Sequence, residues 1–128
     1  MSDQKRDLRV DQFILEQIDS VPHLEALLLI WNTRPKNWTV AEMARALYVR
    51  PEAAAKILDS LAQRDLVSSS AGANYSWVSE ESDKRELLEQ VATSYRKELV
   101  RISSLIHSKA PAGVRDFARA FRFTKEKE

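Results

Sequence analysis

Cysteine is absent from this chain of 128 residues. Its absence excludes disulfide bonds, thiol nucleophiles and cysteine-bound metals. Glycine occurs twice and proline four times, so few positions suit a positive φ or a forced turn. These scarcities disfavour a turn-rich all-β fold, and we expect a mostly α-helical protein.

Long apolar runs are also lacking. No stretch approaches the roughly 20 apolar residues of a membrane helix, and residues 1–7 are polar and charged, unlike a signal peptide. We therefore expect a cytoplasmic protein with no membrane partner. His23 and His107 lie far apart, and no glycine-rich phosphate loop or paired-acid motif occurs. The sequence thus predicts no enzyme, no catalytic residue, no metal site and no cofactor.

Neither sign of charge dominates the chain. Its formal net charge is +1, with 44% hydrophobic and 30% charged residues. This composition is typical of a folded globular domain, and the length suits one domain with appended helices. Because the net charge gives no overall attraction to polyanions, any contact with nucleic acid must come from the distribution of the charges.

The first 37 residues predict two helices and a turn. Ser20 is suited to capping a helix and Pro22 is tolerated in its first turn. Residues 24–31 are apolar nearly all round, which indicates a buried central helix, and the polar cluster 32–37 ends it. An earlier amphipathic helix over about 8–19 is predicted from apolar residues at helical spacing, namely Val10, Phe13, Ile14 and Ile18.

The middle of the chain predicts two short helices separated by a turn. Thr39 and Glu42 have the spacing of a capping box, so a helix should begin there. Pro51 is a favourable first residue for the next helix, after the turn 48–50. The inner faces of the two helices are formed by Val40, Met43, Ala44 and Leu47, and by Ala54, Ile57, Leu58 and Leu61.

A small β-hairpin should follow these helices. Residues 66–70 and 75–79 are β-compatible, and Ala71-Gly72-Ala73-Asn74 between them suits a hairpin loop. The sequence therefore predicts a mostly α-helical chain with one two-stranded hairpin.

The last third predicts one long helix over about 80–107. A break at 109–113 precedes a short basic helix over 114–122, which carries Phe117 and Phe121. The long helix has a heptad seam that could pack on the chain's own first helices, on a second copy, or on both. The short helix could alternatively lie on a membrane surface, but interface packing is preferred. The seam consists of Leu88, Ala92, Tyr95, Leu99, Ile102 and Ile106.

The stretch from Thr39 to Val67 resembles the helix-turn-helix of prokaryotic winged-helix regulators, the broad MarR-like group. Asp65 stands where such proteins commonly have glycine, and aspartate is among the better non-glycine residues at positive φ. Residues 22–31 fit the preceding scaffold helix. The matching positions are the capped helix start, Ala44, Leu47, Leu58, Leu61 and the Leu66-Val67 entry into the wing.

This resemblance implies a winged helix-turn-helix fold with N-terminal and long C-terminal helices. It divides the chain into a leader and helix (1–19), a winged domain (20–80) and a dimerisation segment (81–128). It also implies a homodimeric transcription regulator, with the recognition helix at about 51–64 in the major groove of double-stranded DNA. The dimer-interface candidates are Phe13, Tyr95, Leu99, Ile102, Phe117 and Phe121.

The candidate DNA-binding side chains are Arg45, Arg50, Lys56 and Asn74. Arg50 and Lys56 suit phosphate or guanine contact, or are solvated surface cations. Arg45 suits a backbone contact, or pairs with Glu42 three residues earlier. Asn74 and the serines at 68–70 could contact phosphate, or simply belong to a polar strand and turn.

Other features of the winged segment weaken the case for DNA. Positions equivalent to base-reading side chains hold Glu52, Ala53, Ala55 and Lys56, and the loop at 71–74 has no cation. Across 38–80, the cations Arg45, Arg50, Lys56 and Arg64 are outnumbered by Glu42, Glu52, Asp59, Asp65 and Glu80, giving −1. The alternative is a non-DNA-binding interaction module with a protein partner.

Aromatic stacking offers a further option for nucleic acid. Trp31, Trp38 and Trp77 could stack on single-stranded bases. Core and wing packing is favoured instead, because the three residues are spread over separate elements without interleaved cations.

Overall fold

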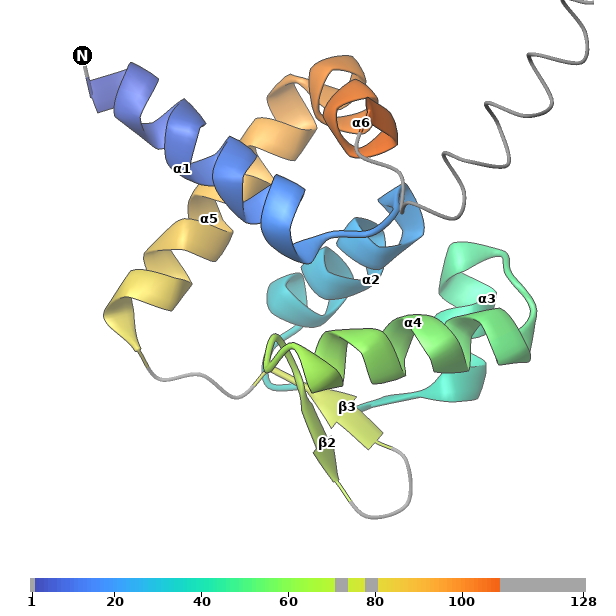
Figure 1. Ribbon diagram of the computed structural model, residues 1–128. Helices are drawn as coiled ribbons and strands as arrows, with labels where there is room; N and C mark the ends of the chain where they lie inside the picture. The colour runs from blue at the N-terminus through green and yellow to red at the C-terminus, as the bar shows by residue number, and fades with distance from the viewer. Residues whose placement is uncertain (1, 71–73, 78–80, 109–128) are drawn as a thin grey trace, which may run out of the picture.

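The computed structural model describes residues 2–70, 74–77 and 81–108, and their side chains from residue 7 onward. Figure 1 shows helix α2 in the middle of the molecule, with α1, α5 and α6 on one side of it and α3, α4 and a small sheet on the other. The mostly helical fold class with a small β-element is therefore confirmed.

Helix α1 (Ser2–Gln17) and helix α2 (Val21–Asn32) are joined by a short link. The Ser20 hydroxyl accepts a hydrogen bond from the His23 backbone N–H at 3.3 Å, as the predicted cap requires. The first helix begins earlier than the predicted residue 8, because no proline, glycine or turn motif interrupts the leader. The predicted apolar stripes are buried, including Val10, Phe13, Ile14 and Ile18 in α1, and Leu24, Leu27, Leu28, Ile30 and Trp31 in α2.

Helix α3 (Val40–Leu47) and helix α4 (Pro51–Gln63) form the helix-turn-helix. Tyr48 ends α3 in the left-handed region, with φ 58° and ψ 43°, and Pro51 begins α4 as predicted. The buried face of α4 consists of Ala54, Ile57, Leu58 and Leu61, so its opposite face points to solvent.

The sheet has three strands, not the predicted two. Strand β3 (Asn74–Ser76) lies between β2 (Ser68–Ser70) and β1 (Trp38–Thr39), and both pairings are antiparallel. The extra strand arises because Trp38 is buried and pairs with Tyr75, which is buried as well. Asp65 enters the wing with φ 57°, which confirms the positive φ expected at that position.

Residues 81–108 contain two helices, α5 (Ser82–Lys97) and α6 (Leu99–Ser108), so the predicted single long helix over about 80–107 is wrong. The helix breaks at Glu98, which has φ −132° and ψ 51°. Both α5 and α6 pack against α1. The bend lets each segment bury its own apolar residues, which are Leu88, Val91 and Ala92 in α5, and Ile102 and Ile106 in α6.

Candidate nucleic-acid interface

A complete capping box fixes the start of α3. The Thr39 backbone N–H donates to Glu42 Oε1 at 2.9 Å, and the Glu42 backbone N–H donates to Thr39 Oγ1 at 3.1 Å. Lys36 Nζ donates to Glu42 Oε2 at 3.1 Å. The backbone hydrogen bond and Lys36 together hold the pKa of the Glu42 carboxyl below its ordinary value.

Arg45 does not pair with Glu42, so that sequence-based alternative is wrong. The Glu42 carboxylate is taken by Lys36, which approaches from the turn before α3. Arg45 is exposed and has no ion pair among the described residues. Its guanidinium is therefore available to an outside anion.

Several other cations of this region are engaged. Arg64 donates to the Asp19 carboxylate at 3.1 Å and to the Glu16 carbonyl at 2.8 Å, so it ties α4 to the end of α1. The Arg34 guanidinium lies 3.5 Å from the centroid of the Trp31 ring. These contacts leave Arg45, Arg50 and Lys56 as the exposed helix-turn-helix cations without an ion pair among the described residues.

Arg50 and Lys56 lie at the N-terminal half of α4. Arg50 is the N-cap residue, and Lys56 is exposed in the second turn of the helix. Glu52 and Ala53 are exposed between them. The structure thus places two predicted cations at the start of α4, together with one carboxylate.

Asn74 lies apart from these cations, in the wing. It begins β3 and pairs with Thr39 of β1 on one side and with Ser70 of β2 on the other. The Ser70 hydroxyl donates to the Asn74 carbonyl at 3.5 Å. The described part of the wing therefore presents hydroxyl and amide groups.

Tyr48 is a surface feature that the sequence reasoning missed. Its side chain is 94% exposed, although it is a bulky residue at a positive φ. Both properties carry a cost for tyrosine, which marks the α3–α4 turn as a surface of interest. No local sequence motif indicates that Tyr48 would be exposed or would have a positive φ.

The tryptophans pack as predicted. The Trp31 and Trp77 rings meet edge to face with centroids 4.9 Å apart. The Trp38 indole N–H donates to Thr33 Oγ1 at 2.8 Å, and the Trp38 side chain is buried. These residues join the wing to the end of α2.

The predicted dimer-interface residues fall into three groups. Phe13 and Ile102 are buried within the single chain, so their side chains have little surface left to offer. Leu99 is 51% exposed, and Tyr95 is partly buried against α2. The remaining two, Phe117 and Phe121, lie outside the described residues.

Further exposed apolar residues lie on α1 and α6. Leu8 in α1 is 64% exposed and Val100 in α6 is 78% exposed. The two helices are linked by Arg101, whose Nη1 lies 2.9 Å from each carboxylate oxygen of Asp11. Leu8 lies three residues before Asp11 in α1 and Val100 lies directly before Arg101 in α6, so both helices of this ion pair carry an exposed apolar side chain.

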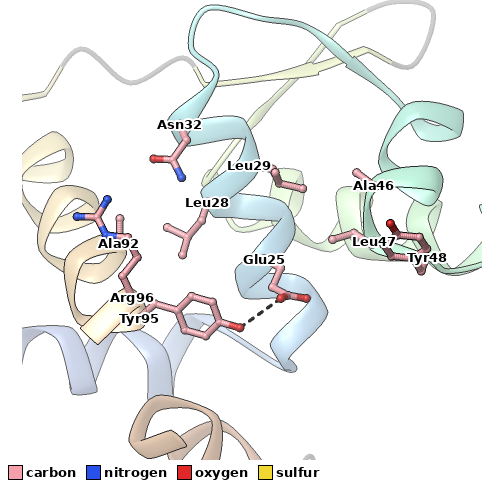
Figure 2. Close-up of a pocket in the computed structure, with 10 residues that line it drawn as sticks. All are labelled: Glu25, Leu28, Leu29, Asn32, Ala46, Leu47, Tyr48, Ala92, Tyr95 and Arg96. Atoms are coloured by element: carbon pink, nitrogen blue, oxygen red, sulfur yellow. Dashed lines mark hydrogen bonds between the residues drawn. The ribbon is translucent and has the colours of Figure 1, made fainter. Parts of the chain in front are cut away.

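A cavity of about 370 Å³ lies between α2, the end of α3 and α5. Figure 2 shows side chains from α2, the end of α3 and α5 around it. Tyr95 donates to Glu25 Oε2 at 3.3 Å across its rim, and burial together with the Glu25 charge raises the pKa of the Tyr95 hydroxyl. The mixed apolar and polar lining suits a small molecule with an apolar body and a polar end.

The described part of the chain offers neither a metal-binding cluster nor a membrane-spanning helix. It contains no group of three or more histidine or acidic side chains placed to hold a metal ion. None of its helices has the length and apolar character that a membrane crossing requires.

Comparisons with known proteins bear on the fold. No protein-family model matches the chain, and a search of curated proteins finds no match. A MarR family protein of Mycobacterium tuberculosis is 16% identical, with a TM-score of 0.53 over 97% of this chain and 88% of that one. MepR, a transcription regulator of a multidrug efflux pump in Staphylococcus aureus, is 13% identical, with a TM-score of 0.51 over 99% and 92%. YusO of Bacillus subtilis is 18% identical, with a TM-score of 0.50 over 96% and 84%.

The element order and these likenesses define the class of fold. The chain is a winged helix-turn-helix protein that resembles the MarR-like regulators. Helix α4 is the second helix of the helix-turn-helix, and β2 and β3 form the wing.

Proposed function

We propose that this chain is a DNA-binding transcription regulator that acts as a homodimer and inserts α4 into the major groove. The observation that carries the proposal is the solvent-facing side of α4. Lys56 is exposed on the side of α4 opposite the buried Ala54 and Leu58, Arg50 is exposed at the N-cap, and neither has an ion pair among the described residues. Exposed arginine and lysine side chains at the start of a helix can contact DNA phosphates and position that helix in the major groove.

Arg45 supports the same function from α3. Its freedom from Glu42 means that three cations of the helix-turn-helix remain available per chain. A homodimer presents six such cations to one duplex, and the phosphate contacts would have to come from these side chains, because the net charge of residues 38–80 stays negative. Two α4 helices about 34 Å apart would then contact successive major grooves on one face of the duplex.

The homodimer itself is supported by exposed apolar side chains on α1 and α6. Leu8, Leu99 and Val100 expose about half or more of their surface to solvent in the single chain. Apolar groups gathered on two packed helices favour contact with another protein surface. A two-fold arrangement of α1 and α6 would cover them, and would leave α4 and the wing free on the far side of α2 (Figure 1).

The first experiment is a binding selection with random duplex DNA at low salt. We expect the full-length protein to enrich one sequence containing two related half-sites, since a two-fold dimer reads each half in the same way. An Arg50→Ala, Lys56→Ala double variant should bind the enriched duplex much more weakly and over a narrower range of salt concentration. If the folded wild-type protein retains no duplex even at low salt, the regulator proposal is wrong.

A protein-interaction module on the same scaffold is the second candidate. The observation that favours it is Tyr48, whose almost fully exposed ring is typical of contact points between proteins. In that case Tyr48→Ala would weaken binding to a protein partner, while Arg50→Ala would have little effect on it. Loss of duplex binding in Arg50→Ala, with duplex binding unchanged in Tyr48→Ala, would favour the DNA-binding regulator.

A further inference from the structure

The first turn of α4 presents an unusual pair of neighbours, Glu52 and Ala53. Both are exposed, and Lys56 lies one turn further along the same face. Residues three and four apart are neighbours on a helix, so Lys56 adjoins both of them. The three side chains form one surface, which we call the reading face.

Glu52 can act only as an acceptor on this surface. Among the described residues it has no ion pair, whereas the other exposed acid of α4, Asp59, accepts a hydrogen bond from Gln63 at 3.0 Å. A carboxylate repels phosphate, so Glu52 adds nothing to general affinity for DNA. Its contribution would have to be selective, through a donor on the edge of a base.

The major groove offers only two base donors, the N4 amino group of cytosine and the N6 amino group of adenine. The adenine amino group is flanked by two acceptors, adenine N7 and thymine O4, which repel a carboxylate. The cytosine amino group has an acceptor on one side only, because the carbon C5 of cytosine lies on the other. Glu52 therefore favours cytosine.

Ala53 offers one methyl group. In the major groove the matching apolar group is the C5 methyl of thymine. An exposed alanine beside Glu52 therefore fits a thymine beside the cytosine, since both bases present their distinguishing groups on the pyrimidine side of the groove.

We propose that the reading face recognises two neighbouring pyrimidines. In this assignment Glu52 accepts from cytosine N4, Ala53 packs on the thymine methyl group, and Lys56 holds the adjacent phosphate. This inference rests on the proposed function, because it assumes that α4 enters the major groove.

The test uses the full-length protein and the duplex enriched by selection. Replacing the thymine by deoxyuridine removes only the methyl group, and should weaken binding about fourfold, as expected for one buried methyl. In Ala53→Gly the thymine and deoxyuridine duplexes should bind equally. The comparison is between two duplexes with one protein preparation, so any loss of folded protein cancels.

Glu52→Gln is the second arm. Glutamine both donates and accepts, and it pairs with adenine N6 and N7, so the preference should move from cytosine to adenine at one position. Lys56→Ala should weaken all duplexes alike and leave both preferences unchanged.

The outcomes separate the two proposals. Failure to enrich any duplex contradicts the proposed function. Enrichment of a duplex with equal affinity for thymine and deoxyuridine at every position, and no change of preference in Glu52→Gln, overturns the reading face and leaves the regulator proposal intact.

Discussion

Lys36 and Glu42 form a hydrogen-bonded ion pair at 3.1 Å, and this pair decides what Arg45 can do. Arg45 lies three residues after Glu42 on the same helix, where an intrahelical pair is usually expected. Because Lys36 occupies the carboxylate, Arg45 stays exposed and without an ion pair among the described residues. The contact between Lys36 in the turn and Glu42 in α3 thus leaves Arg45 available to an outside anion.

Arg45→Ala should weaken binding to duplex DNA about three- to tenfold at low salt, through loss of one phosphate contact per chain. The free energy of unfolding should change little, because the exposed guanidinium has no ion pair to lose. A fluorescence binding titration and a urea denaturation curve measure the two effects. Arg64→Ala is the matched control, since Arg64 is held by Asp19; unchanged DNA affinity in Arg45→Ala would remove Arg45 from the interface.

Thr39→Ala should lower the free energy of unfolding by about 1 kcal/mol, because the Glu42 backbone N–H loses its cap. Thr39→Ser keeps the hydroxyl and should retain most of the stability. Chemical denaturation of the three proteins gives the comparison. Equal losses in both variants would show that the methyl group of Thr39, and not its hydroxyl, stabilises the start of α3.

Acid should weaken the same helix start. The pKa of Glu42 is lowered in the folded chain, so the unfolded chain binds the proton more readily. The contribution of Glu42 to the free energy of unfolding is therefore complete at pH values above the unfolded pKa of about 4.3. That stability is lost as the pH falls through the lower folded pKa. Glu42→Gln lacks the titrating group and should lose less stability over the same acid range in unfolding curves. Parallel pH profiles for the two proteins would contradict this assignment.

A charge at the exposed start of α6 should separate the subunits. Val100→Asp, alone or with Leu99→Asp, places carboxylates in the proposed apolar contact and should give a monomer at micromolar concentration by analytical ultracentrifugation. Ser104→Asp adds the same charge at an exposed site of the same helix and should leave the mass unchanged. A wild-type protein that is already monomeric, or a dimer unaffected by Val100→Asp, would contradict the α1–α6 interface.

The sequence was informative wherever a local pattern decided the structure. The cap at Thr39, the start at Pro51 and the buried stripe of α4 depend on neighbours in the chain, and all three were predicted. The positive φ of Asp65 was also predicted, from the glycine that similar proteins have at that place.

Features set by tertiary packing were not predictable in this way. The residues around Glu98 favour helix, and the break arises because α5 and α6 both pack on α1. Strand β1 has two residues, too few for any periodicity. The partner of Glu42 was missed because the turn brings Lys36 closer than helical spacing brings Arg45.

The sequence predicted which cations belong to the candidate site, but it did not predict which of them have no ion pair. Arg45, Arg50 and Lys56 were named from the sequence, yet only the structure shows that Arg64 is engaged and that these three are not. Tyr48 was missed because tyrosine rarely ends a helix in the left-handed region, and nothing nearby in the sequence indicates it.

The central claim is that α4 binds DNA through its free cations, and the salt dependence of duplex binding tests it most directly. The logarithm of the association constant should fall linearly with the logarithm of salt concentration for the wild-type protein. In the Arg50→Ala, Lys56→Ala variant the slope should be shallower by about 1.8 for each chain bound, that is about 0.9 for each lost phosphate contact. An equal slope in the two proteins, or no measurable binding by the folded wild type at low salt, would contradict the account.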